Sequence, residues 1–288
     1  MKTRSNRQFN RIRTRIARWF FNTRYGRELL ISSIGPRVQK LTVDCGDHVM
    51  TFSPHDYIGR KIFRKGHFER DHVDRLIGVL KERRLVPHGS SLLELGGNIG
   101  TQTVYFALNK TFSHIITVEP DPRNFELLRT NITQNRLADR VTLVNCAAGE
   151  NQGEIDFFQH QHNHGKSSAS RQSVSDCKIV VPVKPVSSIL TEAGTDPDDI
   201  GLVWMDIEGY EPLACRSMQI LLARKVPLYM EFSPAFYGPD QSAAFVQYLS
   251  RFYEDCLLFR EDAGTPAKVR EIPINESQFD VLLFDAAI

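Results

Sequence analysis

Short apolar runs alternate with longer segments of helical spacing through most of this chain. The apolar runs predict seven strands, at residues 92–95, 115–119, 141–147, 201–206, 228–232, 256–259 and 279–284. Helical spacing predicts helices at residues 67–85, 99–108, 122–135, 213–223 and 243–253. This alternation is typical of a doubly wound, mostly parallel α/β sheet. The last two strands lack a helix-length connection, so we expect one of them to be antiparallel.

The first 90 residues follow a different pattern. Residues 1–27 are rich in Arg, and Phe9, Ile12, Ile16, Trp19 and Phe20 recur at helical spacing, which predicts a basic amphipathic leader helix. This leader could attach to an anionic membrane surface, contact a partner, act as a targeting peptide, pack on the domain or fray. Residues 28–90 form a predicted helical and β extension, with strands in LTVDC and HVMTF, and residues 91–288 form the main domain.

A longer insertion at residues 149–198 separates the third and fourth predicted strands. It contains a predicted hairpin arm at residues 154–158 and a polar stretch with His160, His162 and His164. These histidines alternate along a segment that we expect to be extended, so all three could point one way and hold a divalent metal. No Cys or carboxylate stands obviously beside them. We therefore expect no metal site and favour a loop that covers the substrate site.

Composition and charge narrow the functional classes. The chain has 288 residues, 41% hydrophobic and 24% charged, and no apolar run approaches the length of a membrane span. Its five cysteines are scattered without a C-x-x-C pair, which favours a reducing, cytoplasmic location without disulfides or structural zinc. Residues 1–30 hold nine of the 36 basic and one of the 34 acidic groups, which leaves 27 basic and 33 acidic groups for the rest. We expect no nucleic-acid partner for such an acidic body.

The candidate chemistry begins at a glycine-rich turn. Glu94 ends the first predicted strand, Gly96, Gly97 and Gly100 lie in the turn that follows, and Glu119 ends the next strand. Glycine permits positive φ and close approach of a ligand, and a carboxylate at a strand end can accept hydrogen bonds from both ribose hydroxyls. The spacing indicates a nucleoside-binding half-site. The glycines do not fit the G-x-G-x-x-G register, which disfavours a nicotinamide cofactor.

Several segments resemble the FkbM-type methyltransferases, and they follow one another in the family's order. They are ELGGNIG at 94–100, VEPDPRNFELLRTNITQN at 118–135, NCAAG at 145–149, MDIEGYE at 205–211, EF at 231–232 and GHFE at 66–69. Two departures from the family pattern are Glu94 in place of Asp and Gly97 in place of Ala. One such motif is weak, but the ordered series is specific.

The resemblance implies a class I, Rossmann-like fold that binds S-adenosyl-L-methionine and methylates a hydroxyl of a sugar, glycan or natural product. It implies cofactor contacts from Gly96, Gly97, Asn98 and Gly100 around the methionine part, with Glu94 near the ammonium and Glu119 on the ribose. Asn145 and Cys146 would line the adenine. Further implied cofactor contacts come from Glu69, Pro120 and Asp206, the last beside the reacting methyl.

A hydroxyl acceptor needs a general base, because it is a poor nucleophile at neutral pH. Asp206, Glu208 and Glu231 are expected at the ends of adjacent strands, and His67 and Glu69 precede the glycine turn. Any of these could accept the proton, while Glu208 could instead form a salt bridge or stabilise a helix N-terminus with its charge, and His67 could be an ordinary loop histidine. Two other classes stay open: a nucleotide- or NAD-dependent enzyme on a related sheet, and a non-catalytic cofactor-binding module.

Overall fold

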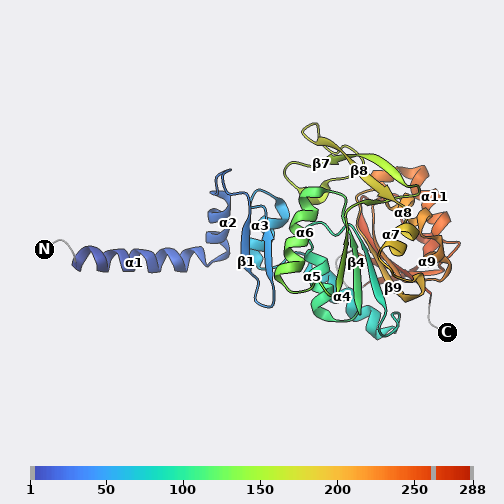
Figure 1. Ribbon diagram of the computed structural model, residues 1–288, viewed down its shortest axis with the longest axis horizontal. Helices are drawn as coiled ribbons and strands as arrows, with labels where there is room; N and C mark the ends of the chain where they lie inside the picture. Colours follow the sequence, from blue (N-terminus) through green and yellow to red (C-terminus); the bar gives the residue numbers. More distant parts are fainter. Residues whose placement is uncertain (1–3, 261–263, 286–288) are drawn as a thin grey trace. The chain divides into compact units, whose positions relative to one another are not determined.

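A mixed eight-stranded sheet forms the centre of residues 69–285 (Figure 1). The structure is a computed structural model that describes residues 4–260 and 264–285. The strand order is β5-β4-β3-β9-β10-β13-β11-β12. The bounds are Ser91–Leu95 (β3), His114–Val118 (β4), Val141–Val144 (β5), Ile200–Met205 (β9), Leu228–Phe232 (β10), Asp255–Phe259 (β11), Thr265–Lys268 (β12) and Phe279–Phe284 (β13).

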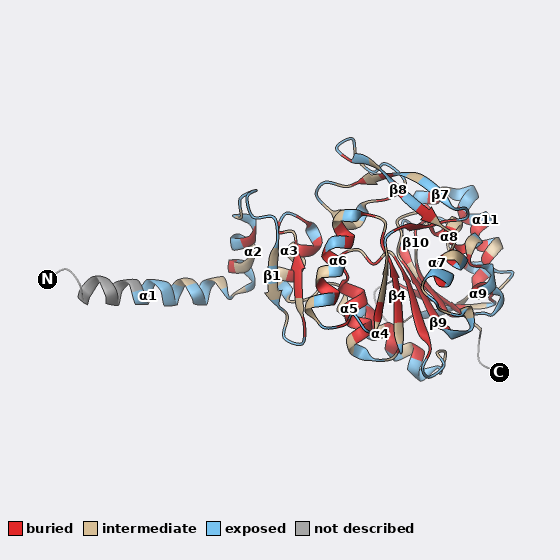
Figure 2. Ribbon diagram, in the orientation of Figure 1, coloured by how far each residue is buried: buried red, intermediate tan, exposed pale blue. Residues whose placement is uncertain are grey.

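Strands β5, β4, β3, β9 and β10 are mutually parallel, and β13 runs antiparallel to both of its neighbours, β10 and β11. The mostly parallel sheet with an antiparallel strand near the chain end is therefore confirmed. The predicted number of seven strands is wrong, because β12 adds an antiparallel edge strand beside β11. Its sequence TPAK has no apolar run, so only its pairing reveals it. Every residue of β3 and β9 is buried, as expected of strands covered on both faces (Figure 2).

The helices of this part differ from the prediction mainly at their ends. The helix after the glycine turn begins at Thr101, because Gly100 adopts a left-handed φ of +88°. The predicted helix 213–223 is interrupted at Met218, where φ is −118°. The bounds are Arg70–Glu82 (α4), Thr101–Asn109 (α5), Pro122–Gln134 (α6), Val186–Glu192 (α7), Glu211–Ser217 (α8), Gln219–Ala223 (α9), Pro234–Tyr237 (α10) and Pro239–Leu249 (α11), with short 3₁₀ helices at His164–Lys166 (η1), Pro197–Asp199 (η2) and Val269–Glu271 (η3).

The insertion builds a second, three-stranded sheet in the order β6-β8-β7. Strand β7 (Gly153–Gln159) contains the predicted hairpin arm and pairs antiparallel with β8 (Cys177–Lys184). Strand β6 (Ala147–Ala148) joins the same sheet. The third predicted strand therefore ends at Val144, since the chain leaves the central sheet there.

Residues 1–68 form a separate compact unit from residues 69–288. The unit contains α1 (Arg4–Phe21), α2 (Arg24–Ser32), a hairpin of β1 (Leu41–Asp44) with β2 (Val49–Phe52), and α3 (Tyr57–Lys65). Glu28 on α2 binds Arg60 at 3.2 Å and Arg64 at 3.0 Å on α3. The division after residue 68 differs from the predicted boundary at residue 90, because α4 packs with α5 in the second unit.

The predicted leader helix is present as α1. Residues 1–3 and the side chains of Phe9 and Ile12 lie outside the described residues. Among the helices that the structure describes, none combines the length and apolar content that a membrane span requires. The cysteines that the structure describes are free thiols, and the cytoplasmic location stays a prediction.

Candidate active site

The glycine turn after β3 is packed against two neighbouring strand ends. The backbone N–H groups of Gly96 and Gly97 both donate to the carbonyl oxygen of Val118, each at 2.9 Å. Gly96 has φ +92°, and a Cβ on it would collide with the carbonyl oxygen of Asp206. The turn therefore requires glycine at position 96 for both conformation and space. A Cβ on Gly97 would meet the hydroxyl of Thr117, so position 97 also lacks space for a larger residue.

Glu119 fixes this turn from the end of β4. Its Oε2 accepts a hydrogen bond from the backbone N–H of Asn98 at 2.8 Å, and its Oε1 accepts one from the N–H of Asp121 at 2.8 Å. The residue is only 5% exposed, and burial, followed by the nearby charge of Asp121, raises the pKa of Glu119 to about 8. A carboxylate oxygen can accept more than one hydrogen bond, so both oxygens keep capacity for ribose hydroxyls.

Glu94 and Asn98 supply unused acceptors on the other side of the turn. Glu94 is fully buried, and its Oε2 accepts a hydrogen bond from the Thr103 hydroxyl at 2.6 Å. Among the residues described, neither Glu94 Oε1 nor Asn98 Oδ1 has a hydrogen-bond partner, although both atoms are buried. Burial raises the pKa of Glu94 to about 7. Orphaned buried acceptors are rare, and these two fit a ligand that carries hydrogen-bond donors, such as an ammonium group.

An apolar slot lies beside the turn. Gly96, Pro120 and Cys146 line it together with Val118, Phe157, Ala169, Ile207 and Tyr210. Its volume is about 30 Å³, so an adenine ring would have to displace part of the lining. Burial raises the pKa of Cys146 to about 11, which keeps a neutral thiol on this wall. Asn145 is exposed instead, and its Nδ2 donates to the carbonyl oxygen of Glu119 at 2.7 Å.

Three carboxylates converge at the ends of β9 and β10. One oxygen each from Asp206, Glu208 and Glu231 lies within 4.8 Å of the other two. Burial and then the charge of Glu231 raise the pKa of Asp206 well above its usual range. Burial is also the main cause that raises the pKa of Glu208 to about 7 and that of Glu231 to about 8. Such a cluster can share protons, act as a general base or hold a divalent cation.

Glu211 holds the loop that carries two of these carboxylates. It is fully buried, and its Oε1 accepts hydrogen bonds from the N–H groups of Ile207 at 3.1 Å and Gly209 at 3.4 Å. The Tyr237 hydroxyl donates to the other oxygen at 2.7 Å. Glu208 itself has a positive φ of 51°, an uncommon conformation that this network maintains. Glu211 belongs to the MDIEGYE motif, and that motif was the only sequence signal for its role.

Two further carboxylates extend the cluster. Glu69 accepts a hydrogen bond from the Gln102 side chain at 2.9 Å, and burial followed by the charge of Asp280 raises the pKa of Glu69 to about 7. Asp280 stands opposite Glu231 in the β10–β13 register and accepts a hydrogen bond from Tyr229 at 2.8 Å. No sequence motif surrounds Asp280, so its place in the cluster could not be predicted from the sequence. His67 belongs to the other compact unit, and its catalytic role stays a prediction.

The histidine-rich segment is folded, so the predicted extended segment is wrong. His160 Nδ1 accepts hydrogen bonds from the N–H groups of His162 at 3.2 Å and Asn163 at 3.1 Å, which turns the chain back. Helix α6 holds the segment, since Asn124 donates to the carbonyl oxygen of His164 at 3.3 Å. Among the described residues, the one group with converging metal-ligand atoms is the carboxylate cluster, not these histidines. Lys166 from the same segment lowers the pKa of Glu208, so the insertion does reach the cluster.

The strand order, the glycine turn after β3 and the acidic residue after β4 that binds this turn define a Rossmann-like fold. A family model, the Methyltransferase FkbM domain, matches residues 94–257, more than half of the chain. The chain belongs to the FkbM methyltransferase family, which confirms the predicted family and fold.

Individual relatives are more distant. The chain is 26% identical over 160 residues to the 2-O-methyltransferase NoeI of Sinorhizobium fredii (strain NBRC 101917 / NGR234), and the match covers 49% of this chain and 63% of NoeI. It therefore spans less than two thirds of that curated relative. A methyltransferase FkbM from Methylobacillus flagellatus KT gives a TM-score of 0.46 at 17% identity, over 68% of this chain and 44% of the other. A methyltransferase from Geobacter sulfurreducens gives a TM-score of 0.42 at 16% identity, over 80% of this chain and 86% of the other.

Proposed function

We propose that this methyltransferase uses S-adenosyl-L-methionine to methylate a hydroxyl group of a small-molecule, sugar or glycan acceptor. One observation carries the proposal: the cofactor half-site and the carboxylate cluster adjoin. The backbone N–H of Asp206 donates to the carbonyl oxygen of Leu95 at 3.0 Å, and Gly96 follows Leu95 directly. A donor bound along the glycine turn would therefore lie next to Asp206.

The residues of the half-site suit the parts of that cofactor. Glu94 and Asn98 would bind the ammonium through their orphaned oxygens, and Glu119 would accept from the ribose hydroxyls. The slot beside Pro120 and Cys146 would receive the adenine. When bound, the cofactor supplies a methyl group already activated by a positive sulfur. The protein must then mainly position the acceptor and accept its proton.

The carboxylate cluster supplies the proton acceptor. Glu231 has a pKa raised to about 8 and Glu208 one raised to about 7, and Asp206 is raised in the same direction. A base whose pKa lies near the working pH is present in its ionised form and still binds a proton well. Mutual repulsion keeps at least one proton in the cluster at neutral pH, so one carboxyl can orient the acceptor while another removes its proton. We assign the base to Asp206, with Glu208 and Glu231 as its partners.

The acceptor class follows from the relatives and from the charge of the site. NoeI is named as a 2-O-methyltransferase, which favours an oxygen acceptor, and sugars or natural products follow from the family resemblance. An acidic site also suits a neutral polyhydroxyl acceptor better than a polyanion such as nucleic acid.

Calorimetry with S-adenosylmethionine and with NAD separates the proposal from its nicotinamide alternative. Glu119→Ala should weaken S-adenosylmethionine binding at least tenfold, while Glu126→Ala, an exposed change on the neighbouring helix, should leave it unchanged. Tight binding of NAD without binding of S-adenosylmethionine would refute the proposed cofactor.

Transfer of a labelled methyl group to a panel of sugars and glycans tests catalysis. Asp206→Asn should abolish most turnover and retain cofactor affinity, whereas Asp199→Asn, an exposed change at the opposite end of β9, should have no effect. Cofactor binding without transfer to any hydroxyl acceptor would support the non-catalytic alternative.

A further inference from the structure

The helix pair α1–α2 of the amino-terminal unit exposes large apolar side chains. Trp19 is 70% exposed and Ile16 is 61% exposed on α1, and Tyr25 is 83% exposed on α2. Leu29, also exposed, lies one turn after Tyr25. A monomer seldom leaves such a group in water, because each buried side chain of this size is worth about 1.5–3 kcal/mol.

The exposed side chains lie apart from the side of α1 that faces α3. On that side Ala17 and Phe21 are half-buried and line an open cavity with Ile62 and Phe63 of α3. Gly26 brings α2 against the end of α1, since a Cβ there would collide with the carbonyl oxygen of Phe20. The amphipathic stripe predicted from the sequence therefore does not pack on the unit, and its apolar members that the structure describes stay available.

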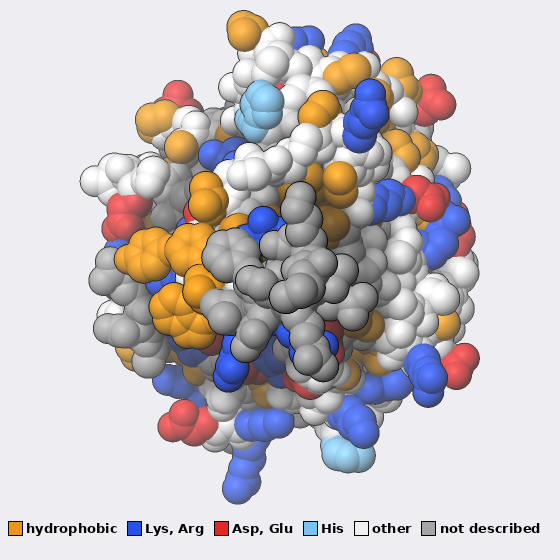
Figure 3. Space-filling view, turned by 90° about the vertical axis from the view of Figure 1, so that its left-hand side faces the viewer, with side chains coloured by type: hydrophobic (Ala, Val, Ile, Leu, Met, Phe, Trp, Pro, Cys, Tyr) orange, Lys and Arg blue, Asp and Glu red, His pale blue; other side chains and the backbone are white. Residues whose placement is uncertain are grey.

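Unpaired cations surround these apolar residues. Arg11, Arg13, Arg15, Arg18 and Arg24 are exposed, and none of them has an ion pair within the described part of the chain. Figure 3 shows a group of hydrophobic side chains on this side of the protein with Lys and Arg side chains beside it. The unit thus presents an apolar centre with a basic surround, which we call the α1–α2 face.

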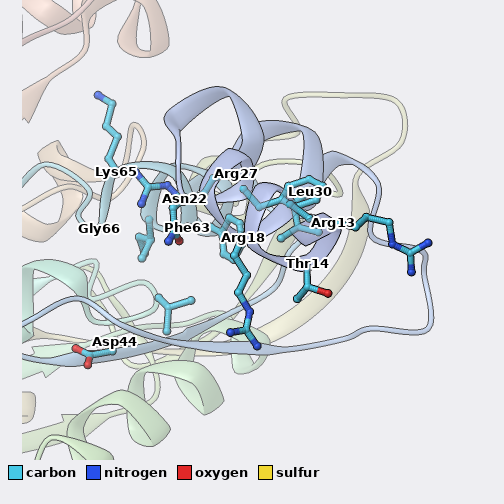
Figure 4. Close-up of a pocket in the computed structure, with 14 residues that line it drawn as sticks. Arg13, Thr14, Arg18, Asn22, Arg27, Leu30, Asp44, Phe63, Lys65 and Gly66 are labelled. Atoms are coloured by element: carbon cyan, nitrogen blue, oxygen red, sulfur yellow. The ribbon is translucent and has the colours of Figure 1, made fainter. Parts of the chain in front are cut away.

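The cavity under α1 shares two of these cations, Arg13 and Arg18, and adds Arg27 and Lys65. It has a volume of about 840 Å³ and is lined by Arg13, Arg18, Arg27 and Lys65, with Asp44 as the acidic member of the lining. Figure 4 shows these basic residues, which belong to α1, α2 and α3, and the charged ends of Arg13, Arg18 and Lys65 point away from one another. Four basic residues and one acidic residue in this lining give the cavity wall a net positive charge.

We propose that the α1–α2 face docks on the surface of an anionic lipid bilayer. A bilayer interface offers both required features, because it combines anionic headgroups with an apolar layer that accepts Trp, Ile and Leu. Residues 1–30 supply nine Lys or Arg and one Glu, a charge complementary to such a surface. A nucleic acid would satisfy the arginines but would leave Ile16 and Leu29 in water, and a second copy of this chain would bring like charges together.

Vesicle sedimentation with the full-length protein tests this docking. We expect binding to vesicles with roughly one third phosphatidylglycerol that is at least tenfold tighter than binding to pure phosphatidylcholine. Raising the salt from about 0.1 M to about 1 M shortens the Debye length from about 10 Å to about 3 Å and should weaken binding at least tenfold. Trp19 fluorescence should shift to the blue, and buried Trp204 should contribute no change.

Matched variants locate the contact. Ile16→Ser with Trp19→Ser, and separately Arg11→Glu with Arg15→Glu, should each weaken vesicle binding at least tenfold. Val174→Ser, at a side chain 97% exposed in the other unit, and Arg251→Glu with Arg270→Glu are controls that should bind normally. All changes are at exposed positions, and thermal unfolding checks that each variant folds.

Three outcomes would overturn the proposal: no vesicle binding, equal binding by the α1 variants, or a dimer that Trp19→Ser converts to monomers. The last outcome would show that a second copy covers the face. The readout needs no methyl transfer, so a failure here is independent of the proposed enzymatic function.

Discussion

Gly96→Ala probes the contact on which the site depends, because Gly96 joins the glycine turn to the strand end that carries Asp206. The alanine would keep a φ near +92° and would place its Cβ against the Asp206 carbonyl oxygen. Positive φ costs an L-residue about 1–2 kcal/mol, and overpacking typically costs about 1–3 kcal/mol. We therefore expect the free energy of unfolding to fall by about 2–5 kcal/mol.

Two other glycines separate these contributions. Gly89 has φ +81° with no heavy atom within 4 Å of a built Cβ, so Gly89→Ala should cost only the conformational part, about 1–2 kcal/mol. Gly78 lies inside α4 with open space around it and an ordinary φ, so Gly78→Ala should stabilise the protein by about 1 kcal/mol. Urea unfolding of the three variants at one pH gives the ranking directly.

Gly96→Ala should also impair the proposed cofactor site. Relief of the collision must move either the turn or the backbone of Asp206, so S-adenosylmethionine affinity should fall at least tenfold, or about 1.4 kcal/mol. Gly89→Ala should leave that affinity unchanged. If Gly96→Ala is no less stable than Gly89→Ala, the packing of the turn against Asp206 is refuted. If it is destabilised but binds normally, the turn does not contact the cofactor.

Three further predictions concern titration and the loop after β9. Burial raises the pKa of Glu94 from 4.5 to about 7, so between these pH values the folded state holds a proton that the unfolded state releases. The resulting stabilisation of about 3 kcal/mol is complete below pH 4.5 and is lost as the pH rises through about 7. Urea unfolding of the ligand-free protein should show that the free energy of unfolding falls as the pH rises, and Glu94→Gln should reduce this pH dependence. A wild-type free energy of unfolding that rises from pH 5 to 8 would contradict the burial of Glu94. Turnover should increase with pH through about 7 to 8 as the carboxylate cluster ionises. Glu231→Gln should lower the pH at which turnover increases, because it removes one negative charge next to Asp206. An unchanged pH–rate profile would exclude Glu231 from the titration. Tyr237→Phe removes the hydroxyl that donates a hydrogen bond to buried Glu211, so the free energy of unfolding should fall by about 1–3 kcal/mol. Turnover should fall more than cofactor affinity. Normal turnover would show that the loop after β9 does not need this hydrogen bond.

The sequence by itself determined the elements whose signal is local. Strands β10 and β13 match their predicted ranges, because a buried strand is a short apolar run whatever its neighbours are. The glycine turn could be located for the same reason, since positive φ at Gly96 and Gly100 is a property of single residues. Glu119 was placed at its strand end by chain order alone, and the structure puts it within 2.8 Å of the turn.

Only the tertiary structure decided which distant residues meet. Asp280 joins Glu231 because β13 inserts antiparallel beside β10, and no local pattern encodes that pairing. Lys166 reaches Glu208 because the insertion folds back onto α6. Likewise, helical spacing predicted the apolar stripe of α1, but only the structure revealed that Ile16 and Trp19 in this stripe stay exposed. The spacing of apolar residues in a segment shows which of its faces can be buried. Strand order and the docking of loops depend instead on how all segments compete for the same core, so they cannot be predicted from one segment alone.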